Sequence, residues 1–258
     1  MRFFRSRQKV DAKLPADASA ARVPEGVLVH AIGDVHGRLD LLSELLGRIA
    51  DDVALRDPSE HRIVLLGDLI DRGPDSAGVV ELCATYDWRE SRPDFVIGNH
   101  EELMLNVLDG DPSGIRFWID NGGDATLRSY GLPPDIIDQG TAEQIMAALS
   151  ARVPAHHIRF LHALCDYLTI GDYWFVHAGI RPGLPLARQK PKDLRWIRGA
   201  FLDHAEPHGG IVVHGHTISP EVDAQPNRIG IDTGAYETGR LTALGLWNTE
   251  RWHLQTGR

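Results

Sequence analysis

The feature that most constrains this chain is a repeated pattern in which a short apolar run ends in a glycine-containing turn rich in Asp, Asn or His. The pattern occupies residues 27–37, 62–68 and 94–101, and it returns in residues 173–179 and 211–217. Short apolar runs bounded by turn residues predict buried strands. Because helix-like stretches alternate with these runs, we expect an α/β or layered α+β fold with its site at the carboxyl ends of the strands.

Helical periodicity fills most of the intervening sequence. Residues 39–53 repeat Leu, Ile and Val on one helical face, and residues 76–86 follow Pro74 as a second helix. Residues 110–165 differ from the rest, with helical patterns at about 141–151 and 154–165. We therefore expect a helical insertion beside the site. Trp118 in this insertion either lines the site or belongs to a helix that ends at the following glycines.

The composition excludes several classes of protein. Of the 258 residues, 43% are hydrophobic and 24% are charged, which is typical of a globular domain in water. The formal charge of −9 argues against a nucleic-acid partner, and no apolar run reaches the ~18–20 residues of a membrane span. Cys83 and Cys165 are expected to be reduced, which predicts a cytoplasmic location.

The chain begins with a basic segment. Residues 1–26 carry six Lys or Arg against three Asp or Glu and are rich in Ala and Pro. We expect a disordered tail, with contact of Phe3, Phe4 and the arginines to an acidic partner or a membrane surface as the functional alternative. Residues 27–258 are expected to form a single domain, and the protein is expected to be a monomer.

Six polar side chains at the strand ends are candidate metal ligands. Carboxylate, amide oxygen and imidazole suit Mn, Fe, Zn or Mg and not soft metals. Six ligands are too many for one catalytic ion that keeps an open position. They favour two divalent ions joined by a bridging carboxylate, as in enzymes of in-line displacement at phosphorus. The candidates are Asp34, His36, Asp68, Asn99, His177 and His216.

Three motifs resemble the signatures of calcineurin-like metallophosphoesterases. They are GDVHG at 33–37, GDLIDRG at 67–73 and GNHE at 98–101. The likeness is to the phosphoprotein phosphatase branch, above all to bacterial and phage serine/threonine protein phosphatases, and it covers residues 27–247. It implies a four-layer α/β/β/α sandwich and two divalent metal ions, of which we expect Mn²⁺, with Fe, Zn or Mg as alternatives.

The resemblance also implies a role for each metal ligand. Asp34 and His36 would bind the first ion, and Asp68 would bridge both ions. The second ion would be held by Asn99, His177 and His216.

The same resemblance assigns the residues that handle the substrate. His100 would protonate the leaving oxygen and Asp71 would orient it. Arg72, Asn99 and Arg198 would bind the phosphate, Arg198 as the second arginine of the family. A hydroxide between the two metal ions would attack phosphorus directly.

The substrate is left open between two main alternatives. We predict a serine/threonine protein phosphatase that acts on a phosphorylated protein, with a small phosphoester as the other class of substrate. Ile97 stands where protein phosphatases commonly carry arginine, which brings the sequence nearer to symmetrical diadenosine tetraphosphatases. Asp71 favours the phosphatase because it completes Asp-Arg-Gly. A phosphodiesterase and an inactive binding module are further alternatives.

Six histidines outside these motifs are expected to face solvent. They are His61, His156, His157, His204, His208 and His253.

Overall fold

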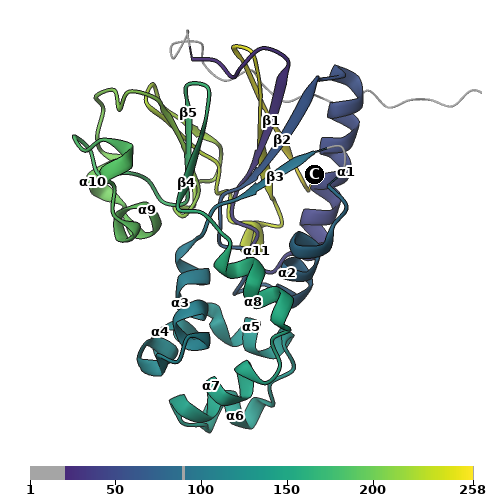
Figure 1. The fold of residues 1–258 in the computed structure, drawn as a ribbon, viewed down its shortest axis with the longest axis vertical. Coiled ribbons are helices and arrows are strands. Elements are labelled where there is room, and N and C mark those ends of the chain that lie inside the picture. Colours follow the sequence, from purple (N-terminus) through teal and green to yellow (C-terminus); the bar gives the residue numbers. More distant parts are fainter. Residues whose placement is uncertain (1–20, 89–90, 258) are drawn as a thin grey trace, which may run out of the picture.

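The computed structural model describes residues 21–88 and 91–257 (Figure 1). Within these residues, ten strands form two five-stranded sheets, ordered β10-β9-β1-β2-β3 and β4-β5-β6-β8-β7. The strands are β1 (Val27–Ile32), β2 (Glu60–Leu65), β3 (Arg92–Phe95), β4 (Tyr167–Ile170), β5 (Tyr173–Val176), β6 (Ile211–His214), β7 (Asp223–Ala224), β8 (Arg228–Gly230), β9 (Thr242–Trp247) and β10 (Glu250–Gln255).

Most of the helices follow a strand end or lie in the insertion. The α-helices are α1 (Leu39–Arg56), α2 (Ser76–Thr85), α3 (Asn99–Leu108), α4 (Ile115–Trp118), α5 (Asp124–Ser129), α6 (Pro134–Gln139), α7 (Ala142–Ser150), α8 (Ala155–His162), α9 (Pro191–Trp196), α10 (Gly199–Leu202) and α11 (Ala235–Thr238). Shorter turns are the 3₁₀ segments η1 (Pro112–Gly114) and η3 (Leu186–Arg188) and the π-type turn η2 (Ile119–Gly123).

The two sheets pack face to face, and helices cover their outer faces. In Figure 1, α1 lies beside the first sheet, and α9 and α10 lie beyond the second. A separate apolar cluster fills each of the three interfaces. This is the predicted four-layer α/β/β/α arrangement. The cluster between the sheets includes Val29, Ala31, Val64, Leu66, Phe175, Val213, Ile229 and Leu244.

The apolar runs of the sequence are explained by this layering. In β1, Val29 and Ala31 face the second sheet, whereas Ile32 packs against the helices, so that both faces of the strand are buried. A strand covered on both faces is apolar along its length instead of alternating. Each fully buried Val, Leu or Ile contributes about 1.5–3 kcal/mol, and the central strands are therefore the most strongly specified part of the chain.

The helical insertion contains more helices than the sequence indicated. The segments expected at about 141–151 and 154–165 form α7 and α8, while α4, α5 and α6 precede them. These three helices have only four to six residues each, too few for a periodic pattern to be recognised. Helices α4–α8 gather at one end of the molecule, below the sheets in Figure 1.

The first described residues pack onto the sandwich. Val23 is buried, and its N–H donates to the carbonyl of Asn248 (3.1 Å). The N–H of Asp172 donates to the carbonyl of Arg22 (3.0 Å). The expected tail covered residues 1–26, but the packed part of the chain already includes Arg22 and Val23. The other part of that expectation, including Phe3 and Phe4, lies outside the described residues.

Two further expectations concern thiols and membranes. Cys83 is buried, Cys165 is half-buried, and both are free thiols. Burial raises the pKa of both thiols, which keeps them protonated and unreactive. Among residues 21–88 and 91–257, no helix combines the length and the apolar character needed to cross a bilayer.

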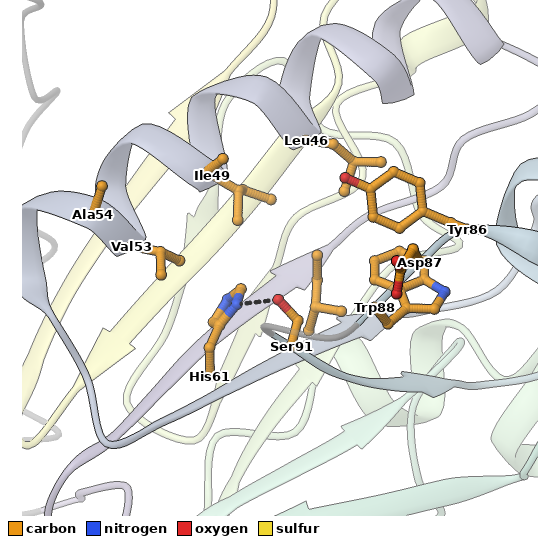
Figure 2. Close-up of a pocket in the computed structure, with 11 residues that line it drawn as sticks. Leu46, Ile49, Val53, Ala54, His61, Tyr86, Asp87, Trp88 and Ser91 are labelled. Atoms are coloured by element: carbon orange, nitrogen blue, oxygen red, sulfur yellow. Dashed lines mark hydrogen bonds between the residues drawn. The ribbon is translucent and has the colours of Figure 1, made fainter.

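A cavity of about 320 Å³ lies on the α1 side of the first sheet, away from the strand ends that carry the motifs (Figure 2). Its apolar wall comes from α1 and from the chain after α2, and His61 and Ser91 form a polar wall. His61 Nδ1 hydrogen-bonds Ser91 Oγ (2.7 Å), and His61 Nε2 hydrogen-bonds the buried His30 (3.0 Å). The expectation that His61 is solvated is wrong, because its side chain completes this buried chain of hydrogen bonds.

Candidate metal centre and active site

The predicted ligands occupy the carboxyl ends of strands in both sheets. Strands β1, β2 and β3 run parallel in one sheet, and β5 and β6 run parallel in the other. The carboxyl ends within each sheet therefore meet at one edge. The side chains that follow these ends are all buried: Asp34, His36, Asp68, Asn99, His177 and His216.

Asp68 lies at the centre of the site. Its Oδ2 is 3.3 Å from His177 Nε2, 3.6 Å from His36 Nε2 and 3.8 Å from His100 Nε2. Its Oδ1 accepts the backbone N–H of His100 (3.1 Å). Two close groups of metal-type ligands share this carboxylate, His36–Asp68–His100 and Asp68–His177–His216. Asp68 is therefore the carboxylate that the two groups have in common.

Backbone carbonyls fix the orientation of two candidate ligand histidines. His177 Nδ1 hydrogen-bonds the carbonyl of Leu66 and His36 Nδ1 that of Ile70, each at 2.8 Å. A carbonyl only accepts, so Nδ1 carries a proton in both rings and Nε2 is the nitrogen that faces the site. His177 Nε2 also lies 3.0 Å from Asn99 Oδ1, which brings the predicted amide ligand into the same group.

Asp34 is placed differently from the other ligands. It is absent from the two close groups, and its Oδ2 accepts the backbone N–H of His216 (3.0 Å). A Cβ at Gly215 would overlap Asp34 Oδ1, so glycine is required there for the carboxylate to fit. Asp34 nevertheless faces the same charges, since Asp232, His177 and Asp68 all act on its pKa.

The burial and the charges of these side chains favour a bound cation. Burial, reinforced by Asp232, raises the pKa of Asp34 well above its usual value, and burial raises the pKa of Asp232 to about 6. Burial lowers the pKa of His216 to about 2, and its buried Nε2 has no hydrogen-bond partner. Buried carboxyls and an unpartnered ring nitrogen are what a divalent ion would satisfy. The donor set therefore fits metal ions.

The pKa of His177 is raised, in contrast to that of His216. Burial opposes its protonation, but the carboxylates of Asp68 and Asp34 outweigh burial and raise its pKa to about 10. The same imidazolium and His100 hold the pKa of Asp68 well below its usual range despite burial. Without a cation in the site, a proton on His177 supplies the positive charge that the carboxylates require.

The backbone of the site is unusual. Among the described residues, seven non-glycine residues have positive φ, and five of them are at the site. Such conformations cost of order 1–3 kcal/mol each and persist where the surrounding structure enforces them. These backbone conformations direct the side chains into the site, where a turn with ordinary backbone angles would not bring them together. The five are His36, Asp68, Asp71, Arg72 and His216.

His100 and Asp71 form a buried pair beside Asp68. His100 Nδ1 lies 2.5 Å from Asp71 Oδ2, and Asp71 also accepts hydrogen bonds from Trp118 Nε1 (2.7 Å) and Thr126 Oγ1 (2.6 Å). Burial opposes a proton on His100, but Asp68 and Asp71 outweigh it and raise the pKa. The pair can therefore hold a proton on the imidazole. Trp118 is buried at the end of α4, just before the turn that contains Gly122 and Gly123, and its indole supports Asp71 from there.

The two predicted phosphate-binding arginines both line a cavity of about 130 Å³. Arg72 Nη1 is 2.7 Å from His36 Nε2, and Nη2 is 3.2 Å from His100 Nε2. The guanidinium also stacks on the ring of Tyr236, 4.9 Å from its centroid. Arg198 donates to Thr217 Oγ1 (3.2 Å) and lines the cavity together with His216.

Glu101 is the main positioning residue that sequence reasoning did not assign. Its Oε2 accepts the N–H groups of Gly98 (2.8 Å) and Asp68 (2.9 Å), and its Oε1 accepts that of Leu69 (2.8 Å). Burial and the charge of Asp68 raise its pKa to about 7. The signal was present, because a Glu three residues after a helix N-cap is the pattern that reaches back to the cap. Thr126 and Trp118 had no comparable signal.

Comparison with known proteins gives the family. Residues 27–241 match the sequence model of the calcineurin-like phosphoesterases. The match spans most of the chain, and the site has the ligand types of a metallophosphoesterase. The chain therefore belongs to the calcineurin-like phosphoesterase family, which makes it a phosphoester hydrolase.

Individual relatives differ in their substrates. The chain is 38% identical over 222 residues to serine/threonine-protein phosphatase 1 of Salmonella typhimurium, covering 83% of this chain and 89% of that one. It is 30% identical over 161 residues to a symmetrical bis(5'-nucleosyl)-tetraphosphatase of Dechloromonas aromatica, covering 62% and 47% of the two chains. A solved structure described as a candidate diadenosine tetraphosphatase shares the fold, with a TM-score of 0.61 at 22% identity over 90% and 94% of the two chains.

Proposed function

We propose that this phosphoesterase is a metal-dependent serine/threonine protein phosphatase. The observation that carries the proposal is the buried His100–Asp71 pair next to Asp68, an acid suited to an alkoxide leaving group such as that of phosphoserine. The relative named as a serine/threonine phosphatase supports it, because that likeness extends over most of both chains.

Two divalent ions would be held by the six strand-end ligands, with Asp68 between them. We expect Mn²⁺, with Fe, Zn or Mg as alternatives, because carboxylate, amide and imidazole donors suit these ions. Such ions supply an activated water nucleophile and stabilise charge on the phosphoryl oxygens. The ligands are Asp34, His36, Asp68, Asn99, His177 and His216.

The protein's own groups position the substrate and move one proton. Arg72, Arg198 and the amide of Asn99 line the same cavity and would bind the phosphoryl oxygens. His100 would donate its Nε2 proton to the leaving oxygen. Its Nδ1 would keep its own proton and remain hydrogen-bonded to Asp71. Asp71 is a positioning residue in this scheme, since it touches His100 and not the phosphate.

The second candidate is a symmetrical dinucleoside tetraphosphate hydrolase. The relative from Dechloromonas aromatica favours it. Two aromatic rings at the rim of the cavity, Phe117 and Trp196, could also stack on a base, with centroids 6.3 Å apart. This candidate uses the same metal ligands and the same acid.

Parallel assays separate the two candidates. The Mn²⁺-loaded protein is given a phosphoserine peptide, diadenosine tetraphosphate and para-nitrophenyl phosphate. The proposal expects kcat/KM for the peptide to exceed that for the dinucleotide, and the reverse order would replace it with the second candidate. Asp68→Asn should abolish all three activities, which assigns them to one site.

A further inference from the structure

A second group of metal-type side chains lies outside the strand-end site. Glu81 projects from α2, and His156 and His157 are neighbours on α8 in the helical insertion. Their three ligand atoms all lie within 4.8 Å of one another. None of these residues contacts the predicted catalytic groups in the hydrogen bonds of the described chain.

Both imidazoles converge on one carboxylate oxygen. His156 Nε2 is 2.7 Å and His157 Nε2 is 2.6 Å from Glu81 Oε2. The two rings stand nearly perpendicular, with centroids 4.5 Å apart. Each ring presents its Nε2 to the same carboxylate oxygen, so the three possible ligand atoms converge on one place.

The cluster combines one fixed ligand with two accessible ones. The His157 side chain is 4% exposed, whereas those of His156 and Glu81 are 42% and 50% exposed. His157 Nδ1 hydrogen-bonds the hydroxyl of Tyr130 (2.9 Å). Metal-binding histidines are commonly held in this way through the ring nitrogen that does not bind the ion. The fixed ring sets the position of the site, and the exposed pair allows an ion to enter.

We propose that Glu81, His156 and His157 bind one divalent transition-metal ion of the zinc type, at a site separate from the strand-end centre. Two imidazole nitrogens and one carboxylate oxygen, with water as the fourth ligand, are a common zinc donor set. A tetrahedral ion would hold these atoms roughly 3.3 Å apart, from zinc–ligand distances of ~2.0–2.2 Å. The exposed side chains of Glu81 and His156 can open by the required amount.

The competing arrangement is an ion pair. Without a metal ion, each Nε2 carries a proton and donates it to Glu81, and Tyr130 donates to His157 Nδ1. With a metal ion, both Nε2 atoms coordinate, and Nδ1–H of His157 donates to Tyr130. The Tyr130 hydroxyl can serve either state, since it both donates and accepts.

An ion at this site would join helices that support the acid pair. Ser76, at the start of α2, accepts the backbone N–H of Asp71 (2.9 Å), and Thr126 of α5 hydrogen-bonds both Ser76 Oγ (2.8 Å) and Asp71. Tyr130 directly follows α5. Linking α2 to α8 therefore stabilises the frame around Asp71. The role is structural, and the catalytic groups do not change.

Zinc counting tests the proposal on the full-length, Mn²⁺-loaded protein. After equilibration with Zn²⁺ and dialysis, we expect wild type to retain about one zinc ion per chain more than Glu81→Gln or His156→Ala. Zn²⁺ that replaces Mn²⁺ at the strand-end centre does so equally in all variants, and this zinc therefore cancels when the zinc content of a variant is subtracted from that of wild type. His162→Ala is the matched control, because His162 is an exposed histidine of α8 that pairs with Asp109 instead.

A second measurement separates the site from the ion pair. With the strand-end centre kept loaded with Mn²⁺, Zn²⁺ should raise the melting temperature of wild type and of His162→Ala by more than that of Glu81→Gln, and Mg²⁺ should produce no such difference. In Glu81→Gln the carboxamide oxygen would still accept hydrogen bonds from both histidines, so that the packing is kept. Equal zinc contents in wild type and Glu81→Gln would overturn the proposal and leave Glu81, His156 and His157 as an ion pair only.

Discussion

The Asp71 carboxylate shows how a single residue is prepared for its role. It is fully buried, and its oxygens accept hydrogen bonds from Trp118 and Thr126 while its partner His100 faces the cavity. A buried carboxylate with several donors is held in one orientation. His100 therefore presents the same nitrogen to every substrate.

The proton donor can be tested by varying the leaving group. His100→Asn keeps a polar side chain of similar reach but removes the acid. For a phosphoserine peptide we expect kcat to fall by about 10²–10⁴-fold, the usual contribution of general acid catalysis. For para-nitrophenyl phosphate the loss should be much smaller, because nitrophenolate leaves without a proton. Equal losses for both substrates in steady-state assays would exclude His100 as the acid.

The support of Asp71 can be tested without touching the acid. Trp118→Phe removes the indole N–H that donates to Asp71 and leaves an aromatic ring in the buried position. Loss of a hydrogen bond to a charged group costs about 1.5–3 kcal/mol. We expect the free energy of unfolding in urea to fall by that amount and kcat for the phosphoserine peptide to fall with it. An unchanged kcat would show that Asp71 is oriented without Trp118.

At the scale of elements, the turn after β2 and the start of α3 form one unit. Glu101, in the first turn of α3, accepts backbone N–H groups of the β2 turn and of Gly98 through both carboxylate oxygens. The turn that carries Asp68 thus depends on a side chain from the next helix. This link helps Asp68 to keep its strained backbone conformation.

Glu101→Gln tests that link. The carboxamide NH₂ group would face backbone N–H donors and leave at least one of them buried and unpaired, at about 1–3 kcal/mol each. We expect lower stability in urea and a lower Mn²⁺ content after dialysis. Glu44→Gln on α1 is the control, because Glu44 forms an exposed pair with Arg48. Full Mn²⁺ retention in Glu101→Gln would limit its role to folding.

The same elements show which parts of the structure can be predicted from sequence. The strand ends could be predicted because a strand buried on both faces leaves a long apolar run, and the ligands follow it directly. Trp118 and Thr126 could not, because their contact with Asp71 depends on how short helices of the insertion pack. The burial of His61 and His157 was missed for a related reason: a histidine is buried when a partner is present, and the partners are distant in sequence.

At the scale of the whole molecule, the site couples metal binding to stability. Burial raises the pKa of Asp34 and Asp232, so the metal-free protein holds carboxyl groups in an unfavourable environment. A ligand that binds only the folded state stabilises it by about 2.7 kcal/mol at a concentration of 100 times its Kd.

Metal removal should therefore lower the melting temperature. We expect dialysis against a chelator to reduce it and added Mn²⁺ to restore it, as measured by circular dichroism. In Asp68→Asn the Mn²⁺-dependent rise should be much smaller, because the shared ligand has lost its charge. Identical melting curves for chelated and Mn²⁺-loaded wild type would contradict metal binding at the strand ends.

Acid sensitivity of the whole fold follows from the hydrogen bonds that join His61 to His30 and Asp52. His30 Nε2 is 3.0 Å from Asp52 Oδ2, and Arg56 also contacts that carboxylate. Burial, together with repulsion from His30, lowers the pKa of His61 to about 3. Burial also lowers the pKa of His30, against the opposing effect of Asp52. In the unfolded chain, both histidines titrate near ~6.5.

The sign of the pH effect follows from these values. Between pH 6.5 and about 3, the unfolded chain binds a proton at His61 that the folded chain does not bind. The contribution of His61 to stability is therefore complete above pH 6.5 and is lost as the pH falls, with a slope of up to about 1.4 kcal/mol per pH unit. His61→Gln removes this titration and keeps an amide to hydrogen-bond His30 and Ser91. We expect urea unfolding of the chelated protein to show a shallower loss of stability between pH 6.5 and 4.5 in His61→Gln than in wild type. His162→Gln, which changes an exposed histidine, should keep the wild-type slope, and parallel curves for His61→Gln and wild type would show that His61 titrates normally in the folded protein.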